Sequence, residues 1–382
     1  MTKPAGWKVL AAPAVLVIVA GIVMHFQDRR AEQNTQPPAT ISRNSQSTPL
    51  GTRVSRSQPA SPAAEAVEQP DDQLARLLAL KLPRETIEEY LRLHNRSAQS
   101  LLAAFHASGD ANKPIGDLSY LKEAATNFPG DPHVQLAVLA QNAFPEARRQ
   151  WLDVFKASSP GNSLANYLSA QDYFKNGQPD AAVKELLEAS SKPQFANFTM
   201  ETYLGEKEMY RANGKSPLES NQAAMSASAG DLLPELSTFK GLAQSMGELQ
   251  KQYANGGDSA SAENMAQFNL ALANRLTGGD SGKLVISQLV GIALEAIALR
   301  NLEPNTSYAF LDGETPSQRT EELKQQKLSI RQLSQSFQSL LPNLTEMEKE
   351  NFEEREKIYG EIPAMRWVVE QRGSGTPSQV RP

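Results

Sequence analysis

Residues 164–193 read LANYLSAQDYFKNGQPDAAVKELLEASSKP, and this stretch predicts two helices joined by a tight turn. Its apolar residues recur at intervals of three and four, which is the period of an amphipathic helix. Gly177 falls between the two apolar runs, where it supports a turn, and Pro193 closes the second run. Ala170 and Ala182 are small enough to let the two helices approach closely. The stretch therefore predicts a helical hairpin.

Similar closing residues occur upstream at nearly constant spacing. Pro129-Gly130-Asp131, Pro160-Gly161-Asn162 and Pro193 lie 31 and 33 residues apart, and each closes a helical stretch. With this spacing the hairpins resemble the tetratricopeptide repeat, a helix–turn–helix unit of about 34 residues. Positions that the family reserves for small or aromatic packing residues are occupied in 164–193 by Ala170, Tyr173, Gly177, Ala182, Leu186 and Ala189.

Weaker versions of the unit surround the best one. Residues 98–129, 133–160 and 199–226 each offer parts of a hairpin, although the second helix of the last unit is poor. About three stacked units are needed to bury a continuous core. The resemblance therefore implies a solenoid of tetratricopeptide-like repeats over residues 72–230.

A solenoid of this family presents a concave groove lined by the first helices of its units, and the groove binds peptides. The resemblance places Asn166 and Tyr167 on such a first helix, and Tyr203 on the next one. These three residues are the candidate partner-binding groove. The aromatic residues at these spacings also suit core packing, so both interpretations stay open.

The second half of the chain is also helical, without a clear repeat. Residues 231–302 predict a helical hairpin bundle, with helices over 236–253, 262–276 and 282–302. The last of these is apolar on nearly all sides, which predicts a central position. A second membrane span is the alternative there, although Ser287, Gln288 and Glu295 disfavour it.

C-terminal helices are expected over residues 303–371, before a disordered tail at 372–382. A long helix is expected around 317–341. Thr345 and Glu348 form a predicted capping box that opens the next helix. The whole folded part is therefore predicted to be all-α.

The N-terminus predicts a membrane anchor. Residues 9–26 carry no charge and are just long enough for one transmembrane helix, after a cytoplasmic stub at 1–8. A cleaved signal peptide is the alternative, but no small-x-small cleavage site follows. Residues 27–71 are rich in Pro, Ser and Gln, which predicts a disordered linker.

Composition excludes several classes of function. The chain has 382 residues and no cysteine, which excludes disulfide scaffolds, thiolate nucleophiles and cysteine-ligated metals. Its net charge of −5 gives no reason to expect nucleic-acid binding. No cofactor is implied by any motif.

Local motifs for chemistry are weak. Residues 277–284 read TGGDSGKL and lack the first glycine and the final hydroxyl of a phosphate-binding loop, so helix capping explains the glycines better. His94 and His106 are interpreted as surface or half-buried residues rather than metal ligands. The glutamates of 346–356 have the spacing of a solvated helix face. No catalytic or metal-binding residue is proposed.

Together these observations predict a single-pass scaffold that binds a protein or peptide partner and has no catalysis of its own. It would be anchored through residues 9–26 in the inner (cytoplasmic) membrane of a bacterial cell, with the C-terminal body outside the cytoplasm. Two alternatives are an all-helical enzyme, with its site between the repeats and the bundle, and a structural subunit of a cell-envelope assembly.

Overall fold

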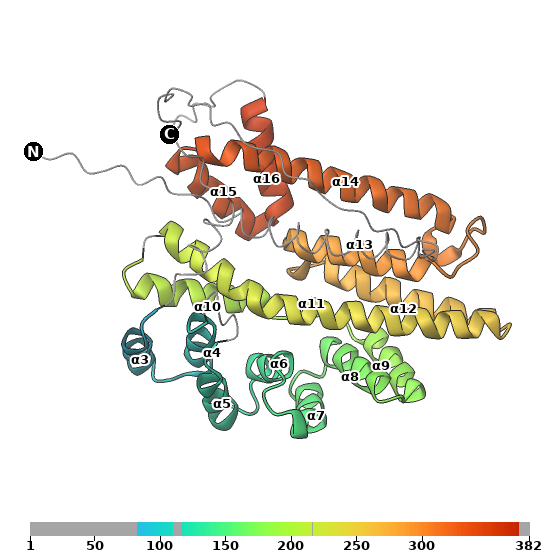
Figure 1. The fold of residues 1–382 in the computed structure, drawn as a ribbon, viewed down its shortest axis with the longest axis horizontal. Coiled ribbons are helices and arrows are strands. Elements are labelled where there is room, and N and C mark those ends of the chain that lie inside the picture. Colours follow the sequence, from blue (N-terminus) through green and yellow to red (C-terminus); the bar gives the residue numbers. More distant parts are fainter. Residues whose placement is uncertain (1–81, 110–115, 216, 374–382) are drawn as a thin grey trace, which may run out of the picture.

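The computed structural model describes residues 82–109, 116–215 and 217–373, and these residues form an all-helical body (Figure 1). Within these ranges the chain folds into 14 α-helices without a β-strand, apart from one isolated parallel bridge between Asn162 and Gln194. The expected all-α class is confirmed for this part of the chain.

Several predictions from the sequence concern residues that the structure does not describe. The stub at 1–8, the membrane span at 9–26 and the linker at 27–71 lie outside the described residues, as do residues 374–382 of the expected tail. Among the helices that the structure does describe, none combines the length and the apolar character that a membrane crossing requires.

The N-terminal part is a series of short helices that begin at polar caps. The side chains of Ser97, Asp117 and Asp131 each accept a hydrogen bond from a backbone N–H in the first turn of the helix that follows. Pro83 precedes the first described helix. In chain order the helices are α3 (Arg84–Leu93), α4 (Ala98–Ala107), α5 (Leu118–Asn127), α6 (Pro132–Ala140), α7 (Arg148–Ser158), α8 (Leu164–Lys175), α9 (Pro179–Ser191) and α10 (Thr199–Ala212).

These helices pack as successive hairpins, α4 with α5, α6 with α7 and α8 with α9. The best predicted unit, 164–193, is the hairpin of α8 and α9, with Gly177 at a φ of 69° in the turn. The first helices α4, α6 and α8 all contact α11 on one side, and α4 also contacts α10 there. We call this side the inner face; α5 and α7 lie away from it (Figure 1).

The longest element is α11 (Pro217–Asn255), which has 39 residues and runs across the inner face (Figure 1). The sequence predicted a poor helix before residue 226 and a separate one over 236–253. One helix instead continues through Gly230 and Pro234. Its buried Phe239, which belongs to the same core cluster as the residues of α8, shows why: tertiary packing outweighs the low helix propensity of these residues.

The C-terminal helices pack around α13. Thr345 and Glu348 form the predicted capping box, and Thr315 forms another with Gln318. Contacts of α13 with α11, α12 and α14 confirm its predicted central position. The helices are α12 (Ser259–Thr277), α13 (Val285–Leu299), α14 (Pro316–Leu340), α15 (Glu346–Tyr359) and α16 (Glu361–Gly373). Short 3-10 turns lie at η1 (Pro145–Ala147), η2 (Ser281–Lys283), η3 (Ala309–Leu311) and η4 (Leu341–Asn343).

Three hydrophobic clusters hold the body together. One joins α3 to α6 with α10 and the start of α11; the second joins α6 to α9 with α11, α12 and α13; the third joins α12 and α13 to α14, α15 and α16. Because α11 contributes to two of them, it connects the N-terminal hairpins to the C-terminal helices. The sequence had placed a domain boundary at residues 230 and 231, within this helix.

Candidate functional site

Asn166, the first of the predicted groove residues, lies inside the protein. It sits on α8 with no exposed surface, and its Nδ2 donates to Glu185 Oε2 at 2.7 Å and to Glu188 Oε2 at 2.9 Å. Its Oδ1 is buried and has no hydrogen-bond partner. A partner on the surface could not contact this side chain in the described conformation.

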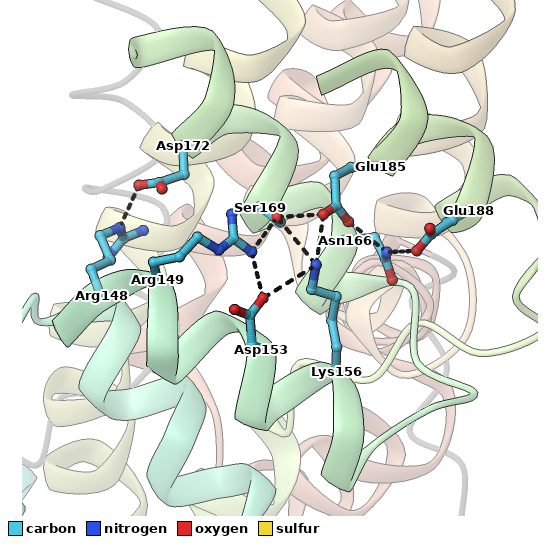
Figure 2. A network of polar contacts seen from close by, with 9 residues as sticks. All are labelled: Arg148, Arg149, Asp153, Lys156, Asn166, Ser169, Asp172, Glu185 and Glu188. Carbon is cyan, nitrogen blue, oxygen red and sulfur yellow. Dashed lines mark hydrogen bonds and ion pairs between the residues drawn. The ribbon is translucent and has the colours of Figure 1, made fainter. Parts of the chain in front are cut away.

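A polar network surrounds Asn166 between α7, α8 and α9 (Figure 2). Glu185 is its centre: Lys156 Nζ lies 2.6 Å from Glu185 Oε1, and Ser169 Oγ donates to the same oxygen at 2.8 Å. Arg149 Nη2 donates to Ser169 Oγ at 2.7 Å, and the guanidinium of Arg149 also lies over the ring of Tyr173. Since Ser169 is fully buried, the network joins three helices rather than offering a reactive hydroxyl.

Tyr167, the second predicted groove residue, is buried beneath α11. Its ring packs edge-on against Phe195 at 6.1 Å between centroids, and Phe195 packs in turn against Phe239 of α11. Burial raises the pKa of Tyr167 to about 12, although the nearby Arg275 guanidinium acts in the opposite direction. The inner face at α8 is therefore covered by the chain itself.

Tyr203, the third predicted groove residue, lies on α10 and is half-buried against the second core cluster. Burial, together with the carboxylates of Glu356 and Glu353, raises its pKa well above the usual value. Lys207, one turn further along α10, has its Nζ 6.0 Å from the Tyr203 ring centroid. Tyr203 and Asn166 thus face different surroundings and do not share one groove.

The inner face is open at its other end, where α4, α6 and α10 meet. A cleft of about 310 Å³ lies there, and a narrower cavity of about 40 Å³ adjoins it through Leu102, His133 and Thr202, which line both. We call the two together the acidic cleft. Its further lining residues are Gln99, Ala103, Asp131, Glu201 and Gly205 in the wide part, and His106, Leu136, Ala137, Ala140, Asn197, Phe198, Thr199 and Glu235 in the narrow part.

Helix termini position the polar groups of the wide part. Asp131 caps α6 by accepting from the backbone N–H of His133 and of Val134. Its Oδ1 also lies 3.3 Å from Nδ1 of His133, and this hydrogen bond contributes most to a lowered pKa of Asp131. Glu201 lies in the first turn of α10, where a carboxylate is favoured by the helix dipole. Asp131 is therefore ionised at neutral pH.

The narrow part contains an unsatisfied donor. Asn197 is only 7% exposed, and its Nδ2 is buried without a hydrogen-bond partner. The next residue, Phe198, has a φ of 55° and a ψ of 16°, a left-handed conformation that side-chain-bearing residues adopt at a cost of about 1–2 kcal/mol. Its ring packs on His133 with 4.1 Å between centroids. The strained backbone of Phe198 is therefore next to the unpaired buried donor of Asn197 in one wall of the narrow part.

Behind the cleft, His106 of α4 is buried rather than at the surface. Its side chain is 4% exposed, and Nδ1 lies 3.4 Å from Oε1 of the fully buried Glu206 on α10. Burial lowers the pKa of His106 to about 3. The interpretation of His106 as a surface or half-buried residue is therefore wrong, because α10 covers it from a position 100 residues away in sequence.

A second group of titratable residues lies on the opposite side of α10, where α15 and α16 begin to pack. Lys207 Nζ is 3.6 Å from Glu353 Oε2, and the carboxylate of Glu361 accepts the backbone N–H of Val285 at 2.5 Å. Burial raises the pKa values of Glu353 and Glu356, and raises that of Glu361 to about 7. The predicted solvated face of 346–356 therefore includes the half-buried Glu353 and Glu356.

Other expectations from local motifs can also be located. Gly278 ends α12, Gly279 has a φ of 54°, and a 3-10 turn follows, so these glycines terminate a helix as predicted. Asp258 caps α12 by accepting from Ser261 N. In the described parts of the chain, no group of three or more His, Asp or Glu is arranged to hold a metal ion.

Comparisons of the chain with protein-family models, with curated proteins and with solved structures find no match. The geometry of the sites is therefore the basis for assigning a function. The acidic cleft was not found by sequence reasoning, because Gln99, Asp131, Asn197 and Glu201 come from separate helices and form no local motif.

Proposed function

We propose that the protein is a membrane-anchored helical scaffold that binds an extended segment of a partner protein in the acidic cleft. The observation that carries this proposal is the cleft itself: an opening of about 310 Å³ at the uncovered end of the inner face, continued by a cavity with an unpaired donor. The tetratricopeptide-like pattern of the hairpins supports the same kind of function.

The size of the cleft favours a peptide over a large cofactor. Pockets that enclose small-molecule ligands usually have volumes of about 300–1,000 Å³, so this one is at the lower limit. Small residues line it, Ala103 and Gly205 in the wide part and Ala137 and Ala140 in the narrow part, which leaves room for a main chain. One side chain and its neighbouring peptide unit match this space.

The cellular arrangement that we propose follows from the sequence. Residues 9–26 would anchor the chain in the inner membrane, and residues 27–71 would tether the helical body outside the cytoplasm. A tether of this composition would let the body reach partners at a distance of roughly 35–40 Å from its anchor.

One observation favours an enzyme as the second candidate. Three glutamates with raised pKa values lie together near Lys207, between α10 and the C-terminal helices, and such groups are typical of acid–base sites. Their contacts favour a structural role, because Glu361 holds the backbone at the start of α13 and Glu353 is paired with Lys207. We therefore prefer the scaffold.

The test is a selection from a random library of 12-residue peptides displayed on phage, using the full-length chain in detergent micelles. Peptides recovered are then measured against two variants of α10. Thr202→Trp fills the cleft, whereas Leu204→Trp changes an exposed residue, 45% accessible, that does not line it.

The proposal predicts peptides that bind the wild-type chain and the Leu204→Trp variant equally and bind Thr202→Trp at least about tenfold more weakly, a loss of about 1.4 kcal/mol. Equal thermal stability of the two variants would show that the loss is local. Failure to recover any peptide that discriminates between the variants would contradict the proposal.

A further inference from the structure

We propose that the acidic cleft selects a segment that carries a lysine or arginine side chain, with the cation in the wide part and a main-chain carbonyl at Asn197. This inference rests on the proposed function and adds the chemistry of the partner. It depends on two independent observations, the sign of the charges in the lining and the unpaired donor in the narrow part.

The residues that line the acidic cleft include carboxylates but no lysine or arginine among the described residues. Asp131 and Glu201 lie in the wide part and Glu235 in the narrow part. Of the two histidines in the lining, His106 is held neutral by burial, because burial lowers its pKa, and Nδ1 of His133 lies 3.3 Å from Oδ1 of Asp131. A cation that enters the wide part therefore meets the carboxylates of Asp131 and Glu201.

The two acids of the wide part are held by different helices. Asp131 is fixed at the start of α6 by two backbone N–H groups, and Glu201 lies in the exposed first turn of α10. Among the described residues, Asp131 lies against His133, and neither acid is paired with an arginine or lysine. A side-chain ammonium or guanidinium could bond both, and hydrogen bonds between ionised groups are about twice as strong as neutral ones.

The narrow part indicates what the rest of the ligand offers. A buried donor without a partner costs folding free energy, so the Nδ2 of Asn197 is a site where an incoming acceptor gains affinity. Leu136, Ala137 and Phe198 line the same space with apolar side chains, and Glu235 adds a carboxylate to it. A peptide carbonyl supplies the acceptor, and a peptide also carries the cationic side chain, which fits both ends of the cleft.

The acidic lining disfavours the opposite class of partner. A segment with aspartate or glutamate would bring like charges next to Asp131 and Glu201, which costs binding free energy. An uncharged apolar segment would leave the Asp131 and Glu201 carboxylates partly desolvated without compensation. The structure therefore favours a basic segment over both.

The experiment uses the peptides recovered by the selection on the full-length chain. Each Arg-containing peptide is labelled with fluorescein and compared by anisotropy with a copy in which citrulline, the uncharged analogue of nearly the same shape, replaces arginine. Lysine-containing peptides are compared in the same way with norleucine copies. We expect lysine or arginine in the recovered peptides and at least about tenfold weaker binding of the uncharged copies.

Two double variants provide the matched control. Asp131→Asn with Glu201→Gln removes both charges, and asparagine still caps α6. Asp180→Asn with Glu354→Gln removes the same number of charges from exposed positions on α9 and α15, outside the cleft. The first variant should bind charged and uncharged copies within about twofold of each other. The second should keep the wild-type preference.

The outcomes separate this inference from the proposed function. Peptides that need an open cleft, as judged by Thr202→Trp, but bind equally well with citrulline would overturn the cation preference and leave the scaffold intact. Recovery of acidic or purely apolar peptides would overturn it as well. Peptides that are indifferent to Thr202→Trp would contradict the proposed function itself.

Discussion

The two ends of the inner face differ in what covers them. At α8, the long helix α11 lies against the first helix of the hairpin, and Tyr167 and Gln171 are buried beneath it. At α4 and α6, the shorter α10 leaves a cleft lined by the half-buried Asp131 and the exposed Glu201. The same face of the hairpins is therefore a hydrophobic interior at one end and a charged opening at the other.

The contact residues show why the two ends differ. At the covered end, Gly241 of α11 brings the backbone so close to α8 that an added Cβ would lie 2.9 Å from Gln171 Nε2. At the open end, Gly205 of α10 faces the flexible Gln99, and the chain enters the helix through the left-handed Phe198. Close helix packing excludes a partner at α8, and the entry to α10 leaves space for one.

The largest effect is expected at the covered end. Replacing Phe239 of α11 with alanine should reduce the free energy of unfolding by about 3–5 kcal/mol, because it removes a fully buried ring that packs on Phe195. Urea denaturation measures this change. The control is Leu328→Ala on α14, where the side chain is 46% exposed and the expected change is within about 0.5 kcal/mol. Equal effects of the two variants would mean that α11 does not pack as described.

A pH-dependent effect is expected on the side of α10 opposite the cleft. The pKa of Glu361 is raised to about 7 in the folded protein, from an ordinary value of 4.5 in the unfolded chain. Between pH 4.5 and about pH 7 unfolding releases a proton from Glu361. The stabilisation that this group contributes is therefore complete below pH 4.5 and is lost as the pH rises to about 7. The loss from this one group should be roughly 2–4 kcal/mol.

Glu361→Gln should remove this part of the pH dependence, measured as the difference in unfolding free energy between pH 5 and pH 8. His106 acts in the opposite direction, because its lowered pKa makes the protein less stable as the pH falls below 6.5. The wild type and Glu361→Gln share the contribution of His106, so it cancels when their two pH profiles are subtracted. Glu354→Gln, at an exposed position, should keep the wild-type profile; a wild-type profile in Glu361→Gln would contradict the assignment.

An intermediate effect is expected where the bundle holds the end of α9. Arg275 of α12 donates to the carbonyl oxygens of Ala189, Lys192 and Gln194, at and just beyond the end of α9. Arg275→Ala should cost about 2 kcal/mol of unfolding free energy, the scale of hydrogen bonds to a charged group. Arg331→Ala, at an exposed position on α14, is the control and should change stability by no more than about 0.5 kcal/mol.

The smallest effect on stability is expected at the open end. The double change of Asp131→Asn and Glu201→Gln should leave the free energy of unfolding within about 0.5 kcal/mol of the wild type, because asparagine keeps the cap of α6 and Glu201 is exposed. If thermal denaturation instead shows that the double variant loses several kcal/mol of unfolding free energy, these acids stabilise the fold rather than serve a ligand site.

Much of the helical framework could be predicted from the sequence, because its signals are local. The hairpin of α8 and α9 followed from apolar spacing and Gly177, and the start of α15 followed from the Thr345 and Glu348 box. The continuity of α11 could not be predicted in this way. Gly230 and Pro234 usually interrupt a helix, and only the packing of residues such as Phe239 explains why this one continues.

The candidate site was less accessible to sequence reasoning. Asn166 and Tyr167 were correctly placed on the first helix of a hairpin, but their burial depends on α9 and α11, which fold back from later in the chain. Asn197 and Glu201 acquire their neighbours Leu102 and His133 only in the folded protein. Contacts between residues that are 60 or more positions apart leave no spacing in the sequence to detect.

Thiol labelling tests the contrast between the two ends most directly, since the chain has no cysteine of its own. A single cysteine is introduced either by Thr202→Cys in the cleft or by Gln171→Cys beneath α11, and each protein is labelled with N-ethylmaleimide under native conditions. We predict that Thr202→Cys reacts at least about 100-fold faster than Gln171→Cys, which must wait for local opening, and that a bound arginine-containing peptide slows only the former. Equal rates at the two positions would contradict the account.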